Sequence, residues 1–532
     1  MRFLNSQTGY ALFLREARKK YYVDKSLLID AVFRYAYETN AYICITRPRR
    51  FGKSVAANMI AAFFDESTRE ESAALFEELA IGTLKEEQLQ DRDPRKAFCW
   101  REQGRLKVIR INMIDILTPD IRSFEDFYRE LCRELVEDIQ EAYANLSIEA
   151  DLSVSLALER TGDQFVFVID EWDAVFEMKF MTPNDKERYI LFLKALLKDK
   201  KYVSFVYMTG ILPISKYSSG SPLNMFKEFS AFSDAIFYPW FGLTRGEIEK
   251  AMKAGGTKAP SIEELAMWYD GYIRGKDGAH IYNPTSVSEA LAEGFCQSHW
   301  TGTGPMNEVR DIIRHNVKDL REDVIRMAGG ETLDIELGGF SVEKTEVNTR
   351  DEILSAMVVY GFLTYHDKRL RIPNHELMLK FRQALASEPL GLNQTLEESR
   401  KLLEATLDRR EEEVARLLED LHDEKIPFFV YNDENSLACV VTVGYLSALE
   451  GYRITREDKA GKGYVDFLFE PMKKTDTALI LELKYNHSAE DAIRCIRERE
   501  YVKRLKDFKN VLLVGINYSE AKKKHTCIIE QV

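Results

Sequence analysis

The sequence predicts an α/β protein in three sections, with approximate borders at residues 255 and 425. Residues 1–255 alternate apolar, strand-like runs with longer helical patterns, residues 256–425 are mostly helical, and residues 426–532 return to strands combined with helices. The length of 532 residues agrees with this division, because domains average roughly 150 residues and three or four are expected.

The first section has the pattern of a parallel sheet covered by helices on both faces. Its strand-like runs are rich in β-branched and aromatic residues and lie at 41–46, 107–114, 165–170 and 201–210. Helical patterns such as 122–143 and 186–198 separate them. Near-continuous apolar strands joined by helices are typical of strands buried on both faces.

A break at 253–260 opens the helical middle section, in which 361–366 and 370–373 are short strand candidates typical of a winged-helix-like element. Residues 393–424 predict helices rich in Glu, Arg and Leu. In the last section we expect a helix over 434–450, strands at 452–457, 464–470 and 477–485, a helix over 488–507 and a strand at 510–516. This order is an αβββαβ arrangement.

The charge of the chain is unevenly distributed. With 74 Lys and Arg against 87 Asp and Glu, the net charge is −13, which argues against nucleic-acid binding by the protein as a whole. Residues 451–532 differ, because they carry 17 basic and 13 acidic residues, or +4, and leave −17 on the rest. Nucleic acid is therefore expected only at the last section.

The cellular setting follows from what the sequence lacks. No run approaches the roughly 18 apolar residues of a membrane span, and the N-terminus has no signal-peptide layout. The seven cysteines are scattered without a CxxC pair. We therefore expect a reduced, cytoplasmic protein with no membrane partner and no disulfide framework.

A phosphate-binding loop is predicted where the first strand meets a helical pattern, at "RPRRFGKS" (47–54). Backbone N–H groups of such a loop and the helix N-terminus cradle phosphates, Lys53 would reach the β- and γ-phosphates, and Ser54 would ligate Mg²⁺. The loop residues assigned to this site are Arg49, Arg50, Phe51, Gly52, Lys53 and Ser54. The pattern GxxxxGK[ST] is broken by Arg47, which replaces the first glycine. Arg49 and Arg50 either neutralise phosphate charge or are solvated loop residues.

Two further strand ends supply candidates for the same site. "FVFVIDEWD" (165–173) is an apolar strand that ends in Asp170 and Glu171, as a Walker B strand does. Asp170 would hold the Mg²⁺ shell and Glu171 would orient the attacking water. Thr209 ends the strand at 201–210 and could sense the γ-phosphate. The alternatives are that the carboxylates merely end a buried strand and that Thr209 is structural.

The last section contains a candidate metal-dependent hydrolytic site. Asp466 is followed, after 15 residues, by Glu482, and Lys484 comes two positions later. Alternation along a strand places Glu482 and Lys484 on one face, and Asp466 on the neighbouring strand can reach the same face. The two carboxylates would bind Mg²⁺ and the lysine would orient water against a phosphodiester. The alternative is an ion pair on an exposed strand.

These motifs resemble a known family. "YYVDKSLLID" (21–30), "RPRRFGKS", "VIDEWD", "TGILPIS" (209–215) and "WYDGY" (268–272) are similar to bacterial AAA-ATPase-like proteins that carry a C-terminal nuclease-like domain, and D-x15-E-x-K resembles the PD-(D/E)XK nuclease superfamily.

The resemblance implies that Lys53, Ser54, Asp170 and Glu171 form an ATP site and that residues 22–25 lie near the nucleotide. It also implies a further metal-side carboxylate at Glu434. The segment 491–501 lacks the glutamine of similar proteins, and Arg494 or Tyr501 would replace it only loosely.

The resulting hypothesis is an ATP-binding and ATP-hydrolysing P-loop protein that regulates a Mg²⁺-dependent nuclease-like domain acting on nucleic acid. ATP would reorder the helical middle and gate access to Asp466, Glu482 and Lys484. One alternative is a nucleotide-binding signalling or interaction module with an inactive nuclease scaffold, and another is a nuclease whose P-loop domain only assists assembly. Whether the substrate is DNA or RNA stays open, as does assembly into a homo-oligomer.

Overall fold

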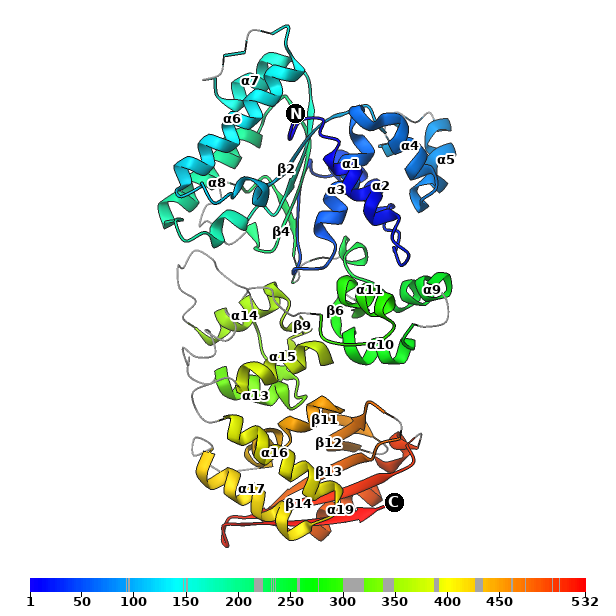
Figure 1. Ribbon diagram of the computed structural model, residues 1–532, viewed down its shortest axis with the longest axis vertical. Helices are drawn as coiled ribbons and strands as arrows, with labels where there is room; N and C mark the ends of the chain where they lie inside the picture. The colour runs from blue at the N-terminus through cyan, green and yellow to red at the C-terminus, as the bar shows by residue number, and fades with distance from the viewer. Residues whose placement is uncertain are drawn as a thin grey trace.

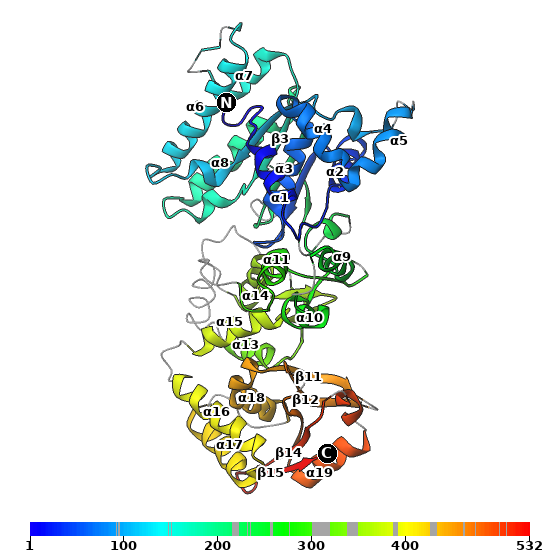
Figure 2. The same ribbon diagram turned by 45° about the vertical axis from the view of Figure 1, so that its right-hand side comes forward.

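The structure, a computed structural model, is elongated, with three parts stacked along its long axis (Figure 1). The N-terminal part lies at one end and the C-terminal sheet at the other, and the same order is clear after rotation (Figure 2). The structure describes the chain apart from residues 92, 94–95, 147, 150–151, 215–222, 231, 233, 235, 256–258, 276, 300–319, 338–348, 387–391, 426–433, 461–462, 474, 500 and 507.

The N-terminal part is built on a five-stranded sheet in the order β2-β3-β4-β1-β5, and all of its pairings are parallel. Its strands are β1 (Tyr42–Thr46), β2 (Lys107–Asn112), β3 (Phe165–Asp170), β4 (Val203–Gly210) and β5 (Lys227–Phe229). The four expected strands are thus confirmed, and β5 is an addition.

Helices cover both faces of this sheet, as predicted (Figure 1). One face carries α1 (Thr8–Ala17), α2 (Leu28–Glu38) and α3 (Lys53–Phe64), beside which lie α4 (Arg69–Glu77) and α5 (Lys85–Gln90). The other face carries α6 (Phe124–Ala142), α7 (Val154–Thr161) and α8 (Pro183–Leu197). All six residues of β3 are buried, which explains its uninterrupted apolar sequence.

The middle part is mostly helical. Its helices are α9 (Arg245–Gly255), α10 (Ile262–Tyr269), α11 (Pro284–Glu293), α13 (Leu320–Ala328), α14 (Arg350–Tyr360) and α15 (His375–Ala386). β6 (Tyr272–Arg274) pairs with β7 (Ala279–Ile281), and β8 (Leu333–Asp334), β10 (Arg369–Arg371) and β9 (Thr364–His366) form a small antiparallel sheet in that order. The two strands expected at 361–373 are therefore present as β9 and β10.

The helices expected over 393–424 are α16 (Leu392–Leu407) and α17 (Glu411–Lys425). Buried residues of both, including Leu402 and Leu418, share one apolar core with α18 and the C-terminal sheet. The sequence assigned this segment to the middle section, whereas its packing lies with the last one. The proposed borders at 255 and 425 stay predictions.

The C-terminal part is a mixed five-stranded sheet in the order β11-β12-β13-β14-β15. Its elements are α18 (Glu434–Gly444), β11 (Tyr452–Ala460), β12 (Gly463–Pro471), β13 (Ala478–Tyr485), α19 (Ala489–Glu498), β14 (Val511–Ser519) and β15 (Lys524–Gln531). Only the β13–β14 pairing is parallel, because α19 crosses over between these strands. The expected αβββαβ order is present, and β15 extends it by one edge strand.

Two predicted helices end earlier than the sequence suggested. α18 stops at Gly444 and a short 3-10 turn covers Leu446–Glu450, while α19 stops at Glu498 and a 3-10 turn covers Tyr501–Leu505. Among the helices that the structure describes, none is long and apolar enough to cross a bilayer.

Candidate functional site

The predicted phosphate-binding loop connects β1 to α3 at the carboxyl end of the parallel sheet. Gly52 occupies the position before the helix with φ +83°, a left-handed conformation that L side chains rarely adopt. Lys53 begins the helix and is 4% exposed, and its Nζ donates a hydrogen bond to the Pro48 carbonyl at 3.1 Å. The helix N-terminus and Lys53 therefore lie together at the loop, as anion binding requires.

Arg47, the residue that breaks the motif, has a structural role. Its guanidinium is buried and forms an ion pair with the equally buried Asp234. Its Nη1 also donates to the carbonyls of Thr46 and Phe229, each at 2.8 Å. Arg47 thus joins the start of the loop to the β5 edge of the sheet instead of pointing toward a ligand.

A cavity of about 660 Å³ lies beside the loop. Its walls include the predicted residues Arg49, Arg50, Gly52, Lys53, Ser54 and Glu171. Glu171 follows β3 with φ +50°, an uncommon conformation for a residue other than glycine, and such conformations cluster at functional sites. The structure thus brings the loop and the end of β3 to one cavity, as the motifs predicted.

Asp170 lies behind this wall and is fully buried at the end of β3. Burial, followed by the charge of Glu171, raises the pKa of Asp170 to about 6, and the nearby Ser54 hydroxyl and Lys53 ammonium oppose that rise. Within the described part of the chain, Asp170 Oδ2 and Thr209 Oγ1 are buried without a hydrogen-bond partner. The unsatisfied buried oxygen of Asp170 beside Ser54 suits a hard divalent cation, so the residues present fit Mg²⁺.

Asp173 is a cavity residue that sequence reasoning missed. It is buried, and its Oδ2 accepts hydrogen bonds from the backbone N–H groups of Ile211 (3.0 Å) and Leu212 (2.6 Å), just after β4. Burial raises its pKa to about 7. The second aspartate of "VIDEWD" was the available signal, and it ties the loop after β3 to the loop after β4.

A second cavity of about 400 Å³ shares Gly52 and Val55 with the first. It is lined by the segment Tyr21 to Val23 and by Lys25, Phe51 and Trp240. Lys25 Nζ bonds to the Pro239 carbonyl at 2.8 Å and to Glu247 at 2.5 Å, which holds the N-terminal segment against the start of the middle part. Tyr22, Val23 and Lys25 therefore line a cavity beside the loop, and the position of residues 22–25 near the nucleotide stays a prediction.

Two loop residues contact the middle part of the molecule, and a third pairs within the N-terminal part. Phe51 is buried edge-on against Tyr272, with ring centroids 4.9 Å apart. Arg50, with φ +71°, donates from Nη1 to the His299 carbonyl at 2.6 Å. Arg49 pairs with Glu177 at 2.9 Å on the cavity rim. Neither arginine is simply solvated, and their contact with phosphate stays a prediction.

Arg245, the first residue of α9, is engaged at the protein surface. Its exposed guanidinium pairs with Glu249 and Glu263, each at 3.0 Å, on the surface of α9 and α10. It lines neither of the two cavities at the loop.

The second candidate site lies on the C-terminal sheet. The antiparallel register of β12 and β13, which pairs Phe467 with Leu481, places Asp466 opposite Glu482 on the same face. Asp466 Oδ2 accepts a hydrogen bond from the Leu483 backbone at 2.6 Å. Lys484 Nζ donates to Glu482 Oε1 at 3.2 Å and to the Leu483 carbonyl at 2.8 Å. The three predicted residues therefore lie together.

Glu482 is 2% exposed and faces α19, where Cys495 Sγ donates to its Oε1 at 2.9 Å. Burial, together with the Glu482 carboxylate, raises the pKa of the Cys495 thiol to about 12. Sequence reasoning considered Arg494, which lies on this helix, and Tyr501, which begins the 3-10 turn after it, and missed Cys495. Arg494 instead pairs with Asp491 at the surface, and the Tyr501 hydroxyl accepts a hydrogen bond from Arg499 at 2.9 Å.

The fit to a divalent cation is partial at this second site. Glu482 Oε2 is buried and has no hydrogen-bond partner among the described residues, so it is an available ligand. Within that same part of the chain, no three His, Cys, Asp or Glu side chains gather as a metal site. Glu434 begins α18, but its side chain lies outside the described residues, so its predicted metal role stays a prediction.

Comparison with known proteins agrees with this division of sites. The family model described as "Predicted AAA-ATPase" matches residues 13–219, and that of the PD-(D/E)XK nuclease superfamily matches residues 432–527. An uncharacterized protein in the vnfD 5′ region of Azotobacter chroococcum mcd 1 is 24% identical over 390 residues, which cover 70% of this chain and 67% of that protein.

Two solved structures are more distantly similar. A Walker-type ATPase of Pyrococcus abyssi is 12% identical with a TM-score of 0.34, covering 67% of this chain and 95% of that one. The ORC2 protein of Aeropyrum pernix is 9% identical with a TM-score of 0.33, covering 68% and 93%. Each of the two segments that the family models match, 13–219 and 432–527, contains one of the candidate sites. The chain thus combines an AAA-ATPase-like domain with a C-terminal domain of the PD-(D/E)XK nuclease superfamily.

Proposed function

We propose that the N-terminal domain binds and hydrolyses ATP and thereby regulates a Mg²⁺-dependent nuclease at the C-terminal domain. The observation that carries the first half is the convergence of Lys53, Ser54 and Glu171 on one cavity, with Asp170 buried behind it. Lys53 and the α3 N-terminus would bind the phosphates, and Glu171 would orient the attacking water. Ser54 and Asp170 would hold Mg²⁺, whose charge neutralises phosphate oxygens. The adjoining apolar cavity at Tyr22 and Phe51 suits the nucleoside.

The register of Asp466 opposite Glu482, with Lys484 on the same strand, supports the nuclease half. Asp466 and Glu482 would hold Mg²⁺, which activates a phosphodiester as a Lewis acid. Lys484 would orient the water that attacks phosphorus. The local charge of +4 over residues 451–532 favours a nucleic-acid substrate.

A continuous series of contacts supports the proposed regulation, beginning at the loop. Phe51 belongs to one buried cluster with Tyr272, Met327 and Ala328, and the Tyr272 hydroxyl donates to the Gly361 carbonyl at 2.7 Å. A Cβ at Gly361 would lie 2.6 Å from Pro48, so the end of α14 rests on the loop. A change in the loop would therefore displace the middle part.

The same middle part reaches the nuclease-like sheet. Glu331, which follows α13, forms a buried ion pair with Arg456 of β11, and Gly330 packs against the β11 backbone. Arg456 is paired with Phe467 of β12, the residue next to Asp466. Contacts thus run without interruption from Phe51 to the strand that carries Asp466.

ATP turnover is tested by phosphate release and nucleotide binding in Lys53→Ala and Glu171→Gln, with Glu187→Gln on the exposed face of α8 as a control. We expect Lys53→Ala to lose both properties and Glu171→Gln to bind ATP but lose roughly 10²- to 10⁴-fold in turnover. If neither variant changes phosphate release while nucleotide still binds, the ATPase assignment fails.

The nuclease is tested with single- and double-stranded DNA and RNA, with Mg²⁺ or Mn²⁺, in the parent and in Asp466→Ala. The exposed Asp476→Ala, in the turn before β13, is the matched control. Equal cleavage by Asp466→Ala and the parent would remove the active-nuclease assignment. Regulation predicts that ATP changes the parent's cleavage rate and has no effect in Lys53→Ala.

One observation favours the alternative of a nucleotide-binding interaction module with an inactive nuclease scaffold. Glu482 is almost fully buried, and its Oε1 already accepts from Lys484 and Cys495. ATP-dependent binding of nucleic acid, without cleavage under any of these conditions, would support that alternative.

A further inference from the structure

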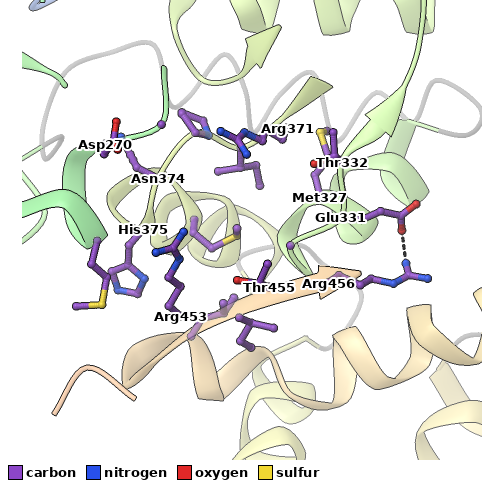
Figure 3. A pocket seen from close by; sticks show the side chains of 18 of the residues that line it. Asp270, Met327, Glu331, Thr332, Arg371, Asn374, His375, Arg453, Thr455 and Arg456 are labelled. Carbon is purple, nitrogen blue, oxygen red and sulfur yellow. Dashed lines mark hydrogen bonds and ion pairs between the residues drawn. The ribbon is translucent and has the colours of Figure 1, made fainter. Parts of the chain in front are cut away.

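A cavity of about 270 Å³ lies where the middle part meets the C-terminal sheet (Figure 3), and its lining includes none of the residues assigned to the two sites described above. One wall comes from β10 and the start of α15, with Arg371, Asn374 and His375. The opposite wall is β11, with Arg453 and Thr455. A ligand bound here would contact both parts of the molecule at once.

Two arginines face this cavity without an acidic partner. Arg371 comes from the middle part and Arg453 from β11 (Figure 3). Across the described chain, no carboxylate forms an ion pair with either guanidinium, and Nε of Arg371 is buried without a hydrogen-bond partner. Buried donors of this kind are costly unless a ligand satisfies them.

The acidic groups of the walls are already engaged. Asp270 accepts from His280 Nδ1 at 3.2 Å, and Glu331 forms ion pairs with Arg326 and Arg456. Burial lowers the pKa of Arg371, the charge of Asp270 opposes this, and the like charge of Arg453 adds to it. Both guanidinium groups line the same cavity, and an anion bound between them would offset their like charges.

The start of α15 adds to the positive electrostatic potential of the cavity. This twelve-residue helix begins at His375, next to Asn374, and both residues line the cavity. Its N-terminal N–H groups carry a partial positive charge, which favours anions. Thr332 and Thr455 add hydroxyl groups to the cavity lining.

We propose that this cavity binds a small phosphomonoester, whose dianion lies between Arg371 and Arg453. Planar guanidinium groups bind phosphate oxygens in pairs, and two of them match the two charges of a phosphomonoester. The small volume suits a low-molecular-weight ligand instead of a duplex. Because the two arginines belong to different parts of the chain, the ligand would hold the nuclease-like sheet against the middle part.

The test uses the full chain in a Lys53→Ala background, which weakens phosphate binding at the loop. Inorganic phosphate and glycerol 2-phosphate are titrated by calorimetry, and amide hydrogen exchange is followed over 369–375 and 452–456. We expect one site at which Arg371→Ala and Arg453→Ala each weaken binding at least tenfold, since a charge-assisted hydrogen bond contributes about 1.5–3 kcal/mol. Both probes should protect the two segments from exchange.

Arg369→Ala is the matched control, because this residue lies on the same strand but is exposed and does not line the cavity. It should bind both probes like the background. Arg453→Ala removes an exposed side chain, so its result does not depend on whether Arg371→Ala folds.

Binding that is unchanged in both arginine variants, or exchange protection confined to the loop at 47–54, overturns the proposal. So does binding of a short oligonucleotide that depends on Arg371 and Arg453 while neither small probe binds. Loss of ATP hydrolysis in the background leaves the proposal intact, because the cavity does not include the loop.

Discussion

Replacing Arg47 by glycine would make the loop match GxxxxGK[ST], yet we expect this change to destabilise the N-terminal domain. The Arg47 guanidinium and the Asp234 carboxylate are each 2% exposed and form an ion pair. The carboxylate also accepts from the backbone N–H groups of Ile236 (2.8 Å) and Phe237 (2.7 Å) through its other oxygen. Removing Arg47 therefore leaves a buried carboxylate without its ion-pair partner, at a position fixed by the chain.

The expected loss in free energy of unfolding follows from the burial of this ion pair. Removing one partner of a buried ion pair costs about 3–5 kcal/mol, which is between two and four orders of magnitude in the unfolding equilibrium. Glycine adds chain flexibility, so Arg47→Met separates the lost charge from the added backbone entropy. The double variant Arg47→Met with Asp234→Asn should recover part of the loss, because it removes both charges.

Urea denaturation followed by tryptophan fluorescence measures this effect, since all five tryptophans lie between residues 100 and 300. Arg49→Met is the matched control on the same loop. Its pair with Glu177 is more than a third exposed, so we expect a loss of only about 0–1 kcal/mol. A stability of Arg47→Met within about 0.5 kcal/mol of the parent, or a double variant no better than the worse single one, would refute the reasoning.

Three further predictions concern the middle and C-terminal parts. Burial lowers the pKa of His525 to about 3, so the unfolded chain binds an extra proton as the pH falls below about 6.5. The free energy of unfolding should therefore decline as the pH falls from about 6.5 to about 3. In acid titrations followed by circular dichroism, His525→Leu should make that decline less steep. An unchanged slope would contradict this. Tyr272→Phe removes the buried hydroxyl that donates to the Gly361 carbonyl and should lower the free energy of unfolding, measured by urea denaturation, by about 1–2 kcal/mol. Equal stability of the variant and the parent would mean that the hydrogen bond contributes nothing. Burial and the Glu482 carboxylate together raise the pKa of the Cys495 thiol, and Glu482→Gln removes the charge of that carboxylate. Alkylation of Cys495 by iodoacetamide at pH 8 should therefore become faster, as measured by mass spectrometry with Cys527 as the internal reference. A rate equal to or below that of the parent would place Cys495 away from Glu482.

Most of the strands were predictable because the local pattern of apolar residues in the sequence indicates which strands are buried. β3 and β4 are apolar along nearly their whole length, as strands covered on both faces must be. β5, Lys227–Phe229, was not predictable, because three residues carry no period and its place is decided by pairing with β1. β15 was hidden by the basic run at 522–525, although its alternation of buried and exposed residues from His525 onward was an available signal.

In the candidate sites, too, some residues were predictable from local sequence and others depend on contacts with distant segments. Lys53, Ser54, Asp170 and Glu171 follow from local motifs, because each lies at the end of a strand or in the segment that follows it, and a parallel sheet brings these strand ends to one edge. Asp173 and Cys495 were missed because their roles depend on contacts with distant segments. Asp173 is positioned by the chain after β4, and Cys495 by the passage of α19 over Glu482.

By itself, the sequence determined the order of the three sections, the α/β class of the two outer ones and the residues of two candidate sites. These properties depend on periodicity and spacing, which are local. Only the tertiary structure decided that Arg47 is an internal ion-pair partner, that α16 and α17 pack on the C-terminal sheet, and that Arg371 and Arg453 face one cavity. The physical reason is that burial and charge pairing depend on which segments meet, and these segments are separated by tens to hundreds of residues.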